Sequence, residues 1–403
     1  MKKDLSPKII YYLSLIGFFA IFSTTIAKSP ALPLYVSALG GSDIIIGLIS
    51  AFSPLAGILF SFPIGLLSDK IGRKKLLIAS GAIFLTAPLL YLLVGSPIWL
   101  IPIRFFHGIA TAILGPVAAA MIVRTYSTSK GEKLGYYSSA TLIGRALAPI
   151  LGGFIISYFA TTGLSLIQYH YVYIAAFALA IPVFILTLWL PNEEKNNLPA
   201  GAKDLFIDLK YFFANKRLFS TAGVEMAIYF AYGALETYLP LYLTRLNISA
   251  RQIGLIFSAQ ILAIALSKPL FGKLADKTDK RKLILIGALI LGLSMGAIGY
   301  FQTVAAAIIL GLIFGLGLSF STVATTSYAA EVTEHSKLGS SLGALSSVMD
   351  IGQTAGPVIT GIAVACFSFK IGFLLSFALV IITGLIFYLY NRTRLEFDKK
   401  SLS

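Results

Sequence analysis

Charged residues are scarce in this chain. Asp, Glu, Lys and Arg make up 12% of its 403 residues, whereas soluble globular domains carry about 25%. The single cysteine, Cys366, excludes an internal disulfide bond and a thiolate metal cage. The three histidines form no HExxH motif or paired cluster of the kind that binds zinc. We therefore expect no metal and no cofactor.

Motifs of nucleotide-driven and catalytic proteins are also missing. The sequence contains no G-x-x-x-x-G-K-[ST] loop, so it gives no sign of ATP hydrolysis. No serine–histidine–aspartate set stands out. We assign no catalytic residues, and an enzyme is the function class that the sequence supports least.

Apolar sequence is abundant, with 57% hydrophobic residues and a mean hydropathy of +0.86. A helix needs roughly 20 apolar residues to cross the hydrocarbon core of a bilayer. The sequence contains twelve such stretches, which are continuous rather than alternating and so exclude barrel strands. It predicts an all-α membrane protein whose transmembrane helices are centred near Phe18, Leu55, Phe84, Thr111, Arg145, Phe177, Ile228, Leu262, Leu291, Phe314, Met349 and Leu379.

The net charge of +15 would suit a nucleic-acid-binding protein, but the positions of the charges argue against one. With the N-terminus in the cytoplasm, 25 Lys and Arg residues fall on the inner side and 4 on the outer side. This bias follows the positive-inside rule. We expect a multi-pass protein of the cell (inner or plasma) membrane with both termini cytoplasmic and no nucleic-acid partner. The apolar run from Ile9 to Ile26 is long for a signal peptide, and we expect it to remain as the first helix.

The two halves of the sequence repeat each other. Residues 65–75 (GLLSDKIGRKK) recur as residues 272–282 (GKLADKTDKRK), 207 positions later (272 − 65), and LPLY at residues 32–35 recurs at 239–242. We predict an N-terminal half of six helices (residues 1–190), a cytoplasmic linker (residues 191–217) and a C-terminal half of six helices with a short tail (residues 218–403). Because six is even, the two bundles are inserted the same way up and are pseudo-symmetric. The linker either lies along the inner membrane surface or is a tether between the halves.

Three motifs resemble those of the major facilitator superfamily, and the resemblance covers nearly the whole chain. Residues 65–75 match that family's loop pattern G-x-L-x-D-[KR]-x-G-[RK]-[RK], whose second copy departs where glycine becomes Asp279. Arg104 and Gly108 resemble the R-x-x-x-G motif of helix four. Residues 135–153 resemble the pattern G-x8-G-x3-G-P-x2-G-G of the drug/proton antiporters, with alanine at position 148. Residues 343–361 repeat it with glycine restored at position 356 and Thr360 in place of another glycine. The resemblance implies the major facilitator fold.

The resemblance also implies that the repeated loop latches an inner gate. Asp69 needs a cationic partner, and Arg124 at the inner end of helix four is the candidate. Adding 207 to 124 gives Glu331, so this acid and Arg281 are expected to form a mirror latch with the charges exchanged. The predicted latch residues are Gly65, Asp69, Gly72, Arg73, Arg124, Asp276, Arg281 and Glu331.

A ladder of small residues is repeated as well. Gly144, Ala148 and Gly152 are four positions apart and share one face of helix five, so that a neighbouring helix can approach closely. Pro149 bends the same helix. The ladder indicates either a helix that rocks at low cost or ordinary close packing. The predicted hinge or packing residues are Gly144, Pro149, Gly152, Gly352, Gly356 and Pro357.

Ionisable residues within the predicted spans carry most of the functional information, because each is costly in a bilayer unless it faces a cavity or a partner. At 1.5 Å per residue, Arg145 and Asp350 lie about 18 and 20 Å from the inner ends of their helices. A buried acid such as Asp350 or Glu225 suits the loading and unloading of a proton, whereas arginine keeps its charge and suits a carboxylate. The predicted substrate and proton cavity comprises Arg104, His107, Arg145, Glu225, Tyr229, Tyr232 and Asp350.

Lys28 and Glu236 lie near the outer ends of helices one and seven, which approach each other at the outer mouth of carriers of this family. We expect either an ion pair that forms an outer gate, or a lysine that reaches the headgroups and an acid that meets water.

These features predict a secondary active transporter that works by alternating access. The repeated ladder and the acids of the second half favour proton-coupled efflux of small organic or drug-like molecules. An alternative is uptake or facilitated transport of an anionic metabolite, with Arg104 and Arg145 as its carboxylate site, and a more remote one is a transport-inactive membrane receptor. The expected partners are the lipid bilayer, a small-molecule solute and protons, and the expected state is a monomer.

Overall fold

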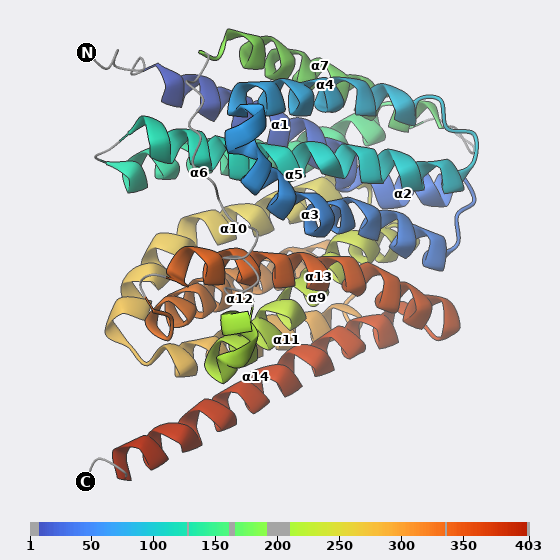
Figure 1. Cartoon of the computed structure of the whole chain (residues 1–403). Coiled ribbons are helices and arrows are strands. Elements are labelled where there is room, and N and C mark those ends of the chain that lie inside the picture. The colour runs from blue at the N-terminus through green and yellow to red at the C-terminus, as the bar shows by residue number, and fades with distance from the viewer. Residues whose placement is uncertain (1–7, 127–128, 161–165, 192–209, 335–336, 401–403) are drawn as a thin grey trace, which may run out of the picture. The chain divides into compact units, whose positions relative to one another are not determined.

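The computed structural model describes residues 8–126, 129–160, 166–191, 210–334 and 337–400, without the side chains of residues 62, 65–67, 69–70 and 393–400. All regular elements within these ranges are helices (Figure 1). The first half contains α1 (Ile9–Lys28), α2 (Ala31–Ala38), α3 (Asp43–Ile71), α4 (Arg73–Tyr91), η1 (Pro97–Trp99), α5 (Leu100–Thr125), α6 (Lys130–Tyr158) and α7 (Ile167–Trp189). The second half contains α9 (Lys216–Arg245), α10 (Ala250–Lys277), α11 (Lys280–Ile298), α12 (Val304–Glu331), α13 (Leu338–Cys366) and α14 (Phe369–Lys400).

Twelve helical segments of the described residues are long and apolar enough to cross a membrane, and each of the twelve predicted centres lies in one of them. Large apolar side chains point away from the interior along these segments. Leu266 is 74% exposed, Ile386 61% and Leu293 59%. Contiguous apolar surface of this kind is unfavourable in water and normal in lipid. The predicted all-α membrane fold with twelve spans is confirmed.

The chain divides into two compact units. Unit 1 comprises Met1–Pro199 and Pro240–Ser258, and unit 2 comprises Ala200–Leu239 and Ala259–Ser403. The connection between α9 and α10, with the helix ends beside it, therefore groups with the N-terminal half. The predicted boundaries of the two halves, at residues 190 and 218, stay a prediction.

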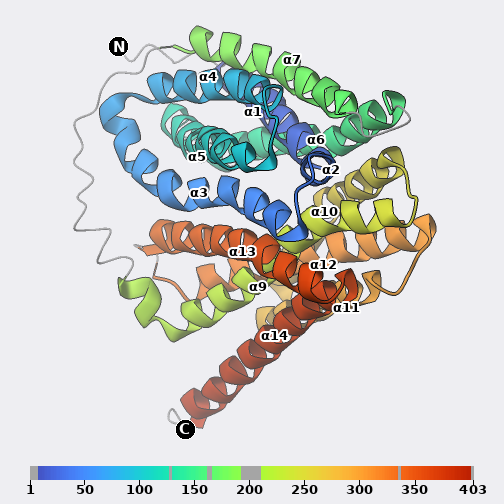
Figure 2. The same cartoon turned by 90° about the vertical axis from the view of Figure 1, so that its right-hand side faces the viewer.

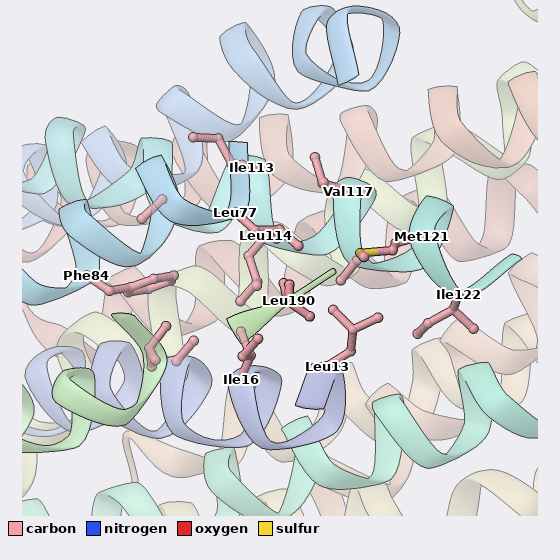
Figure 3. Packing of buried hydrophobic residues seen from close by; sticks show 14 of the residues in the cluster. Leu13, Ile16, Leu77, Phe84, Ile113, Leu114, Val117, Met121, Ile122 and Leu190 are labelled. Carbon is pink, nitrogen blue, oxygen red and sulfur yellow. The ribbon is translucent and has the colours of Figure 1, made fainter. Parts of the chain in front are cut away.

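The core of unit 1 lies where α1, α4 and α5 meet (Figure 3). Leu13 and Ile16 of α1 pack in the same cluster as Leu77 of α4 and Val117 of α5, and each of the four is at most 1% exposed. Leu13 and Ile16 are three residues apart, so they lie on one face of α1. In lipid this contact is held by van der Waals packing, because the membrane itself is as apolar as leucine.

The internal repeat is visible in the helix contacts. α4 packs beside α5 and α7, and α11 packs beside α12 and α14 (Figure 1, Figure 2). A Cβ atom at Gly108 of α5 would lie 2.6 Å from the carbonyl oxygen of Ser53, and one at Gly315 of α12 would lie 2.6 Å from that of Gln260. Both residues of the second pair are 207 positions after those of the first (315 − 108 and 260 − 53). The predicted pseudo-symmetry therefore extends to individual backbone contacts.

The small residues of α6 lie against α1 in unit 1. A Cβ atom at Gly144 would come within 2.5 Å of the carbonyl oxygen of Phe18, and one at Gly152 would lie 3.2 Å from the side chain of Ile26. Pro149 lies between these two contacts and is buried. The glycines let the two helices approach to backbone contact, as the ladder predicts.

The copy of this ladder brings α13 against α9 in unit 2. A Cβ atom at Gly352 would overlap the carbonyl oxygen of Met226, and one at Gly356 would overlap that of Phe230. Pro357 is buried beside them, and its carbonyl oxygen accepts a hydrogen bond from the hydroxyl of Tyr238 at 3.0 Å. The contacts show close packing, and a hinge at either ladder stays a prediction.

Candidate functional site

A cavity of about 380 Å³ lies inside unit 2, between α9, α10, α12 and α13. Glu225 and Tyr229, one helical turn apart on α9, line one wall. Lys268 of α10, Thr326 of α12 and Met349 of α13 line the others. The cavity therefore combines one acid, one base and one aromatic ring with polar and apolar walls.

Glu225 is the acidic group of this cavity. It is 5% exposed, and its Oε2 atom accepts a hydrogen bond of 2.6 Å from the hydroxyl of Thr325. Lys268 interacts with it electrostatically. The carboxyl group can be balanced by a bound proton, by the lysine ammonium or by a cation that enters the cavity, because each supplies one positive charge.

Two more of the predicted cavity residues belong to unit 2. Tyr232 is 7% exposed, and its ring centroid lies 6.1 Å from that of Tyr229. Asp350 is half-buried beside Met349, but it is not among the residues that line the cavity. The structure thus brings Glu225 and Tyr229 together, with Tyr232 next to them.

The three basic residues predicted for the cavity belong to unit 1. Arg104 and His107 are each 1% exposed in α5, whereas Arg145 is exposed on α6. The two arginines of the alternative carboxylate site therefore lie in different surroundings. A role for these residues in a shared cavity stays a prediction.

The loop between α3 and α4 turns at Gly72. Gly72 has a φ of +99°, a conformation that L-amino acids with a side chain rarely adopt. Arg73 follows it and is 7% exposed, and Arg124 is exposed in the last turn of α5. The side chain of Asp69 and the surroundings of Gly65 lie outside the described residues, so the pairing of Asp69 with Arg124 stays a prediction.

The second copy of this loop has different partners from those expected. Lys280 Nζ lies 2.7 Å from Oε2 of Glu331. The guanidinium of Arg281 instead donates to both carboxylate oxygens of Asp279, at 2.9 and 2.7 Å. Asp279 also begins α11 by accepting from the backbone N–H of Arg281 at 3.1 Å. The expected pair Arg281–Glu331 is therefore replaced by two pairs, and Asp276 is exposed beside them.

Asp279 lies outside the membrane-spanning segments, and its charged form is favoured. The hydrogen bonds from the Arg281 side chain lower the pKa of this carboxyl below its usual value of about 3.8. The residue that departs from the glycine of the motif has thus become the acceptor that holds Arg281.

Asn391 of α14 joins this network and was not predicted from the sequence. Its backbone oxygen accepts from Nη1 of Arg281 at 3.0 Å, and its Oδ1 atom accepts from the hydroxyl of Tyr328 at 2.9 Å. Its amide donates to the hydroxyl of Ser220 at 3.1 Å. A single asparagine thereby links α9, α11, α12 and α14. No motif marks it, and the departure at Asp279 was the only sequence signal nearby.

The predicted outer-gate residues belong to different units. Lys28 is half-buried in the last turn of α1 in unit 1. Glu236 is 8% exposed on α9 in unit 2, where Nε2 of Gln353 donates to it at 3.4 Å. The ion pair between Lys28 and Glu236 stays a prediction, and Gln353 is a partner that the sequence did not indicate.

The chain resembles known proteins over nearly its full length. It matches the family model described as Major Facilitator Superfamily over residues 13–250 and 222–401. It is 26% identical over 362 residues to the "Uncharacterized MFS-type transporter MJ1560" of Methanocaldococcus jannaschii, which covers 90% of this chain and 92% of that protein. It is 29% identical over 265 residues to the multi-drug resistance efflux pump PmrA of Streptococcus pneumoniae, over 64% of each chain.

A solved structure shares the fold. The bacterial homologue of the human lysosomal transporter Spinster, in its inward-facing and unoccupied conformation, matches with a TM-score of 0.82. The match covers 98% of this chain and 99% of the other at 17% sequence identity, so the likeness is one of fold.

Proposed function

Because the chain belongs to the Major Facilitator Superfamily and is a membrane transporter rather than an enzyme, we propose that it exports small organic, drug-like molecules across the plasma membrane in exchange for protons. The observation that carries this proposal is the cavity of unit 2, with buried Glu225 in its wall. The name of PmrA, a multidrug efflux pump, supports the direction of transport.

The cavity has the size and lining for a small amphipathic solute. Its volume of about 380 Å³ falls within the range of about 300–1,000 Å³ for small-molecule sites. The ring of Tyr229 offers a face on which an organic cation can stack. Met349 adds a deformable apolar wall that tolerates solutes of different shape.

Exchange follows from the single carboxylate of Glu225. One carboxylate balances one positive charge, so a proton and a cationic solute compete for it, and either one has to take the place of the Lys268 ammonium. A proton bound from the outside is released inside when a cationic solute takes its place, and the loaded cavity then opens outward. Two occupants that compete for one site are the physical requirement for antiport by alternating access.

The remaining features of the proposal concern orientation and assembly. The excess of Lys and Arg on one side of the membrane supports cytoplasmic termini. The cavity is lined by residues of one chain, which supports a monomer as the transporting species.

The proposal is tested with purified protein in proteoliposomes that have an acidic lumen, with ethidium as the lipophilic cation. We expect ethidium to accumulate inside as protons leave, and a protonophore to abolish the accumulation. Replacing the acid in Glu225→Gln should lower the gradient-driven rate about tenfold or more, which corresponds to about 1.4 kcal/mol of lost interaction. The matched control is Glu334→Gln, because Glu334 is an exposed acid of the same unit.

Two results would contradict this proposal. If a panel of lipophilic cations that includes ethidium enters equally with and without the pH gradient, export by proton exchange is wrong. If Glu225→Gln keeps the coupling of the unchanged protein, the proton is carried elsewhere.

A further inference from the structure

Arg104 places a full positive charge inside the helix bundle of unit 1. It lies in the first turns of α5 and is 1% exposed. Its Nε and Nη1 atoms are buried and have no hydrogen-bond partner among the described atoms. Since a guanidinium does not lose its proton in proteins, this charge persists at every physiological pH.

Three further donors surround the guanidinium. His107 lies one turn later on α5, Tyr91 ends α4, and Tyr173 comes from α7. Each is at most 1% exposed. Both ring nitrogens of His107 and the phenol oxygen of Tyr173 lack a hydrogen-bond partner among the described atoms, and the phenol oxygen of Tyr91 has only the Arg104 guanidinium beside it. Arg104 interacts electrostatically with all three residues. We call these four residues the polar cluster.

The polar cluster is tightly enclosed by aromatic rings. The rings of Tyr91 and Tyr173 stack with centroids 4.4 Å apart and planes 7° apart. The ring of His107 lies edge-on to Phe84 at 5.7 Å and to Tyr91 at 6.2 Å. The hydroxyl of Tyr35 donates to the backbone oxygen of Tyr91 at 3.0 Å, which holds the end of α4 in place. These rings therefore pack directly around the polar cluster, and an organic solute would have to displace them.

The described side chains of unit 1 provide no carboxylate to balance this charge. Their two acids are Asp43 and Glu132, in the first turns of α3 and α6. Asp43 lies 3.6 Å from Arg245, and Glu132 lies 3.0 Å from Lys133. Both acids are thus at helix ends and already have basic neighbours, while Arg104 is in the interior.

A buried charge is stable only when a countercharge accompanies it. Water would satisfy the donors of the polar cluster, but it would leave the charge unbalanced. A monatomic anion satisfies both requirements, because it accepts hydrogen bonds from any direction and neutralises the guanidinium. We propose that unit 1 binds a halide ion of the size of chloride between Arg104, His107, Tyr91 and Tyr173. This site is separate from the cavity at Glu225 and does not depend on the direction or solute of transport.

The test is the thermal unfolding of the purified full-length protein as sodium chloride replaces sodium gluconate at constant ionic strength. We expect the unfolding temperature to rise saturably by at least about 2 °C, since a ligand that binds only the folded state stabilises it. Bromide should act like chloride. The response should be lost in Arg104→Gln and kept in Arg145→Gln, which removes the exposed arginine of α6.

A milder variant keeps the test decisive if Arg104→Gln does not fold. Tyr173→Phe removes one donor and retains the stacked ring, and it should raise the chloride concentration of half-maximal response about tenfold. Equal responses in the unchanged protein and both variants would overturn the proposal. A response to acetate but not to halides would also overturn it. A protein that responds to no anion would do the same, and would indicate that water occupies the site.

Discussion

Asp279 shows how one residue can replace a motif position and gain a role of its own. Where the loop pattern has glycine, this aspartate caps α11 and binds the Arg281 side chain through both oxygens. Arg281 is thereby held away from Glu331, which pairs with Lys280. At this scale, the geometry of a side chain's nearest hydrogen-bond partners decides which charges meet.

The Asp279–Arg281 pair should make stability depend on pH. The folded pKa of Asp279 is lowered, so its stabilising contribution is present above the unfolded value of about 3.8 and is lost as pH falls through the lower folded value. Asp279→Asn keeps a residue that caps helices well. It should therefore lose only the ion pair, about 0.5–1 kcal/mol at neutral pH.

The measurement is the unfolding temperature of both proteins from pH 7 to pH 3. The difference between them should begin to shrink as pH falls below about 3.8, where Asp279 of the unfolded chain takes up a proton, and should shrink further toward the lower folded pKa. The variant Glu334→Gln, which replaces an exposed acid, serves as the control. Its difference in unfolding temperature from the unchanged protein should not shrink in this way. A difference that stays constant across this range would mean that the carboxylate charge does not contribute.

The internal repeat produces two similar helix pairs. α1 meets α6 through Gly144, and α9 meets α13 through Gly352 and Gly356, in each case by direct approach of glycine to a backbone carbonyl. Approach at this distance is characteristic of membrane helices, in which small residues replace the hydrophobic effect as the basis of packing. A side chain at any of these positions has to push the partner helix away.

Gly352→Ala should therefore destabilise the protein by about 1–3 kcal/mol, since its methyl group would overlap the carbonyl oxygen of Met226. Gly343→Ala on the same helix is the matched control, because nothing lies within 4 Å of a Cβ atom there. The control should be neutral or up to about 1 kcal/mol more stable, as alanine favours a helix. Thermal unfolding in detergent measures both. Equal stability of the two variants would show that α9 and α13 separate without cost.

The whole molecule is defined by its orientation in the membrane. The charge bias predicts cytoplasmic termini. An N-terminus on the inner side and twelve crossings put the end of α13 on the outer side. Cys366, the only cysteine, ends this helix and is exposed. The chain thus contains a native reporter of its own topology.

A membrane-impermeant maleimide added to intact cells should label Cys366. A second protein that combines Cys366→Ser with Gly339→Cys places the thiol at the opposite end of α13, at an exposed glycine. This variant should react only after the cells are permeabilised. The reverse pattern of labelling would place both termini outside and refute the predicted orientation.

The membrane fold, its twelve spans and its internal repeat followed from the sequence alone, because the hydrocarbon core demands long apolar helices and a duplication keeps its register. Gly72 and the two glycine ladders were likewise predictable, since a turn and a close helix contact both require a missing side chain. Each of these features is determined by the residues of one short stretch of sequence.

The tertiary structure decided which charged residues lie close together and which of them are buried. It put Glu225 and Lys268 on one cavity, enclosed Arg104 while leaving Arg145 exposed, and joined four helices through Asn391. Spacing along a helix gives the depth of a residue, but its partners depend on the rotation of that helix and on which helices lie beside it. Both are set by packing between segments that are far apart in the sequence.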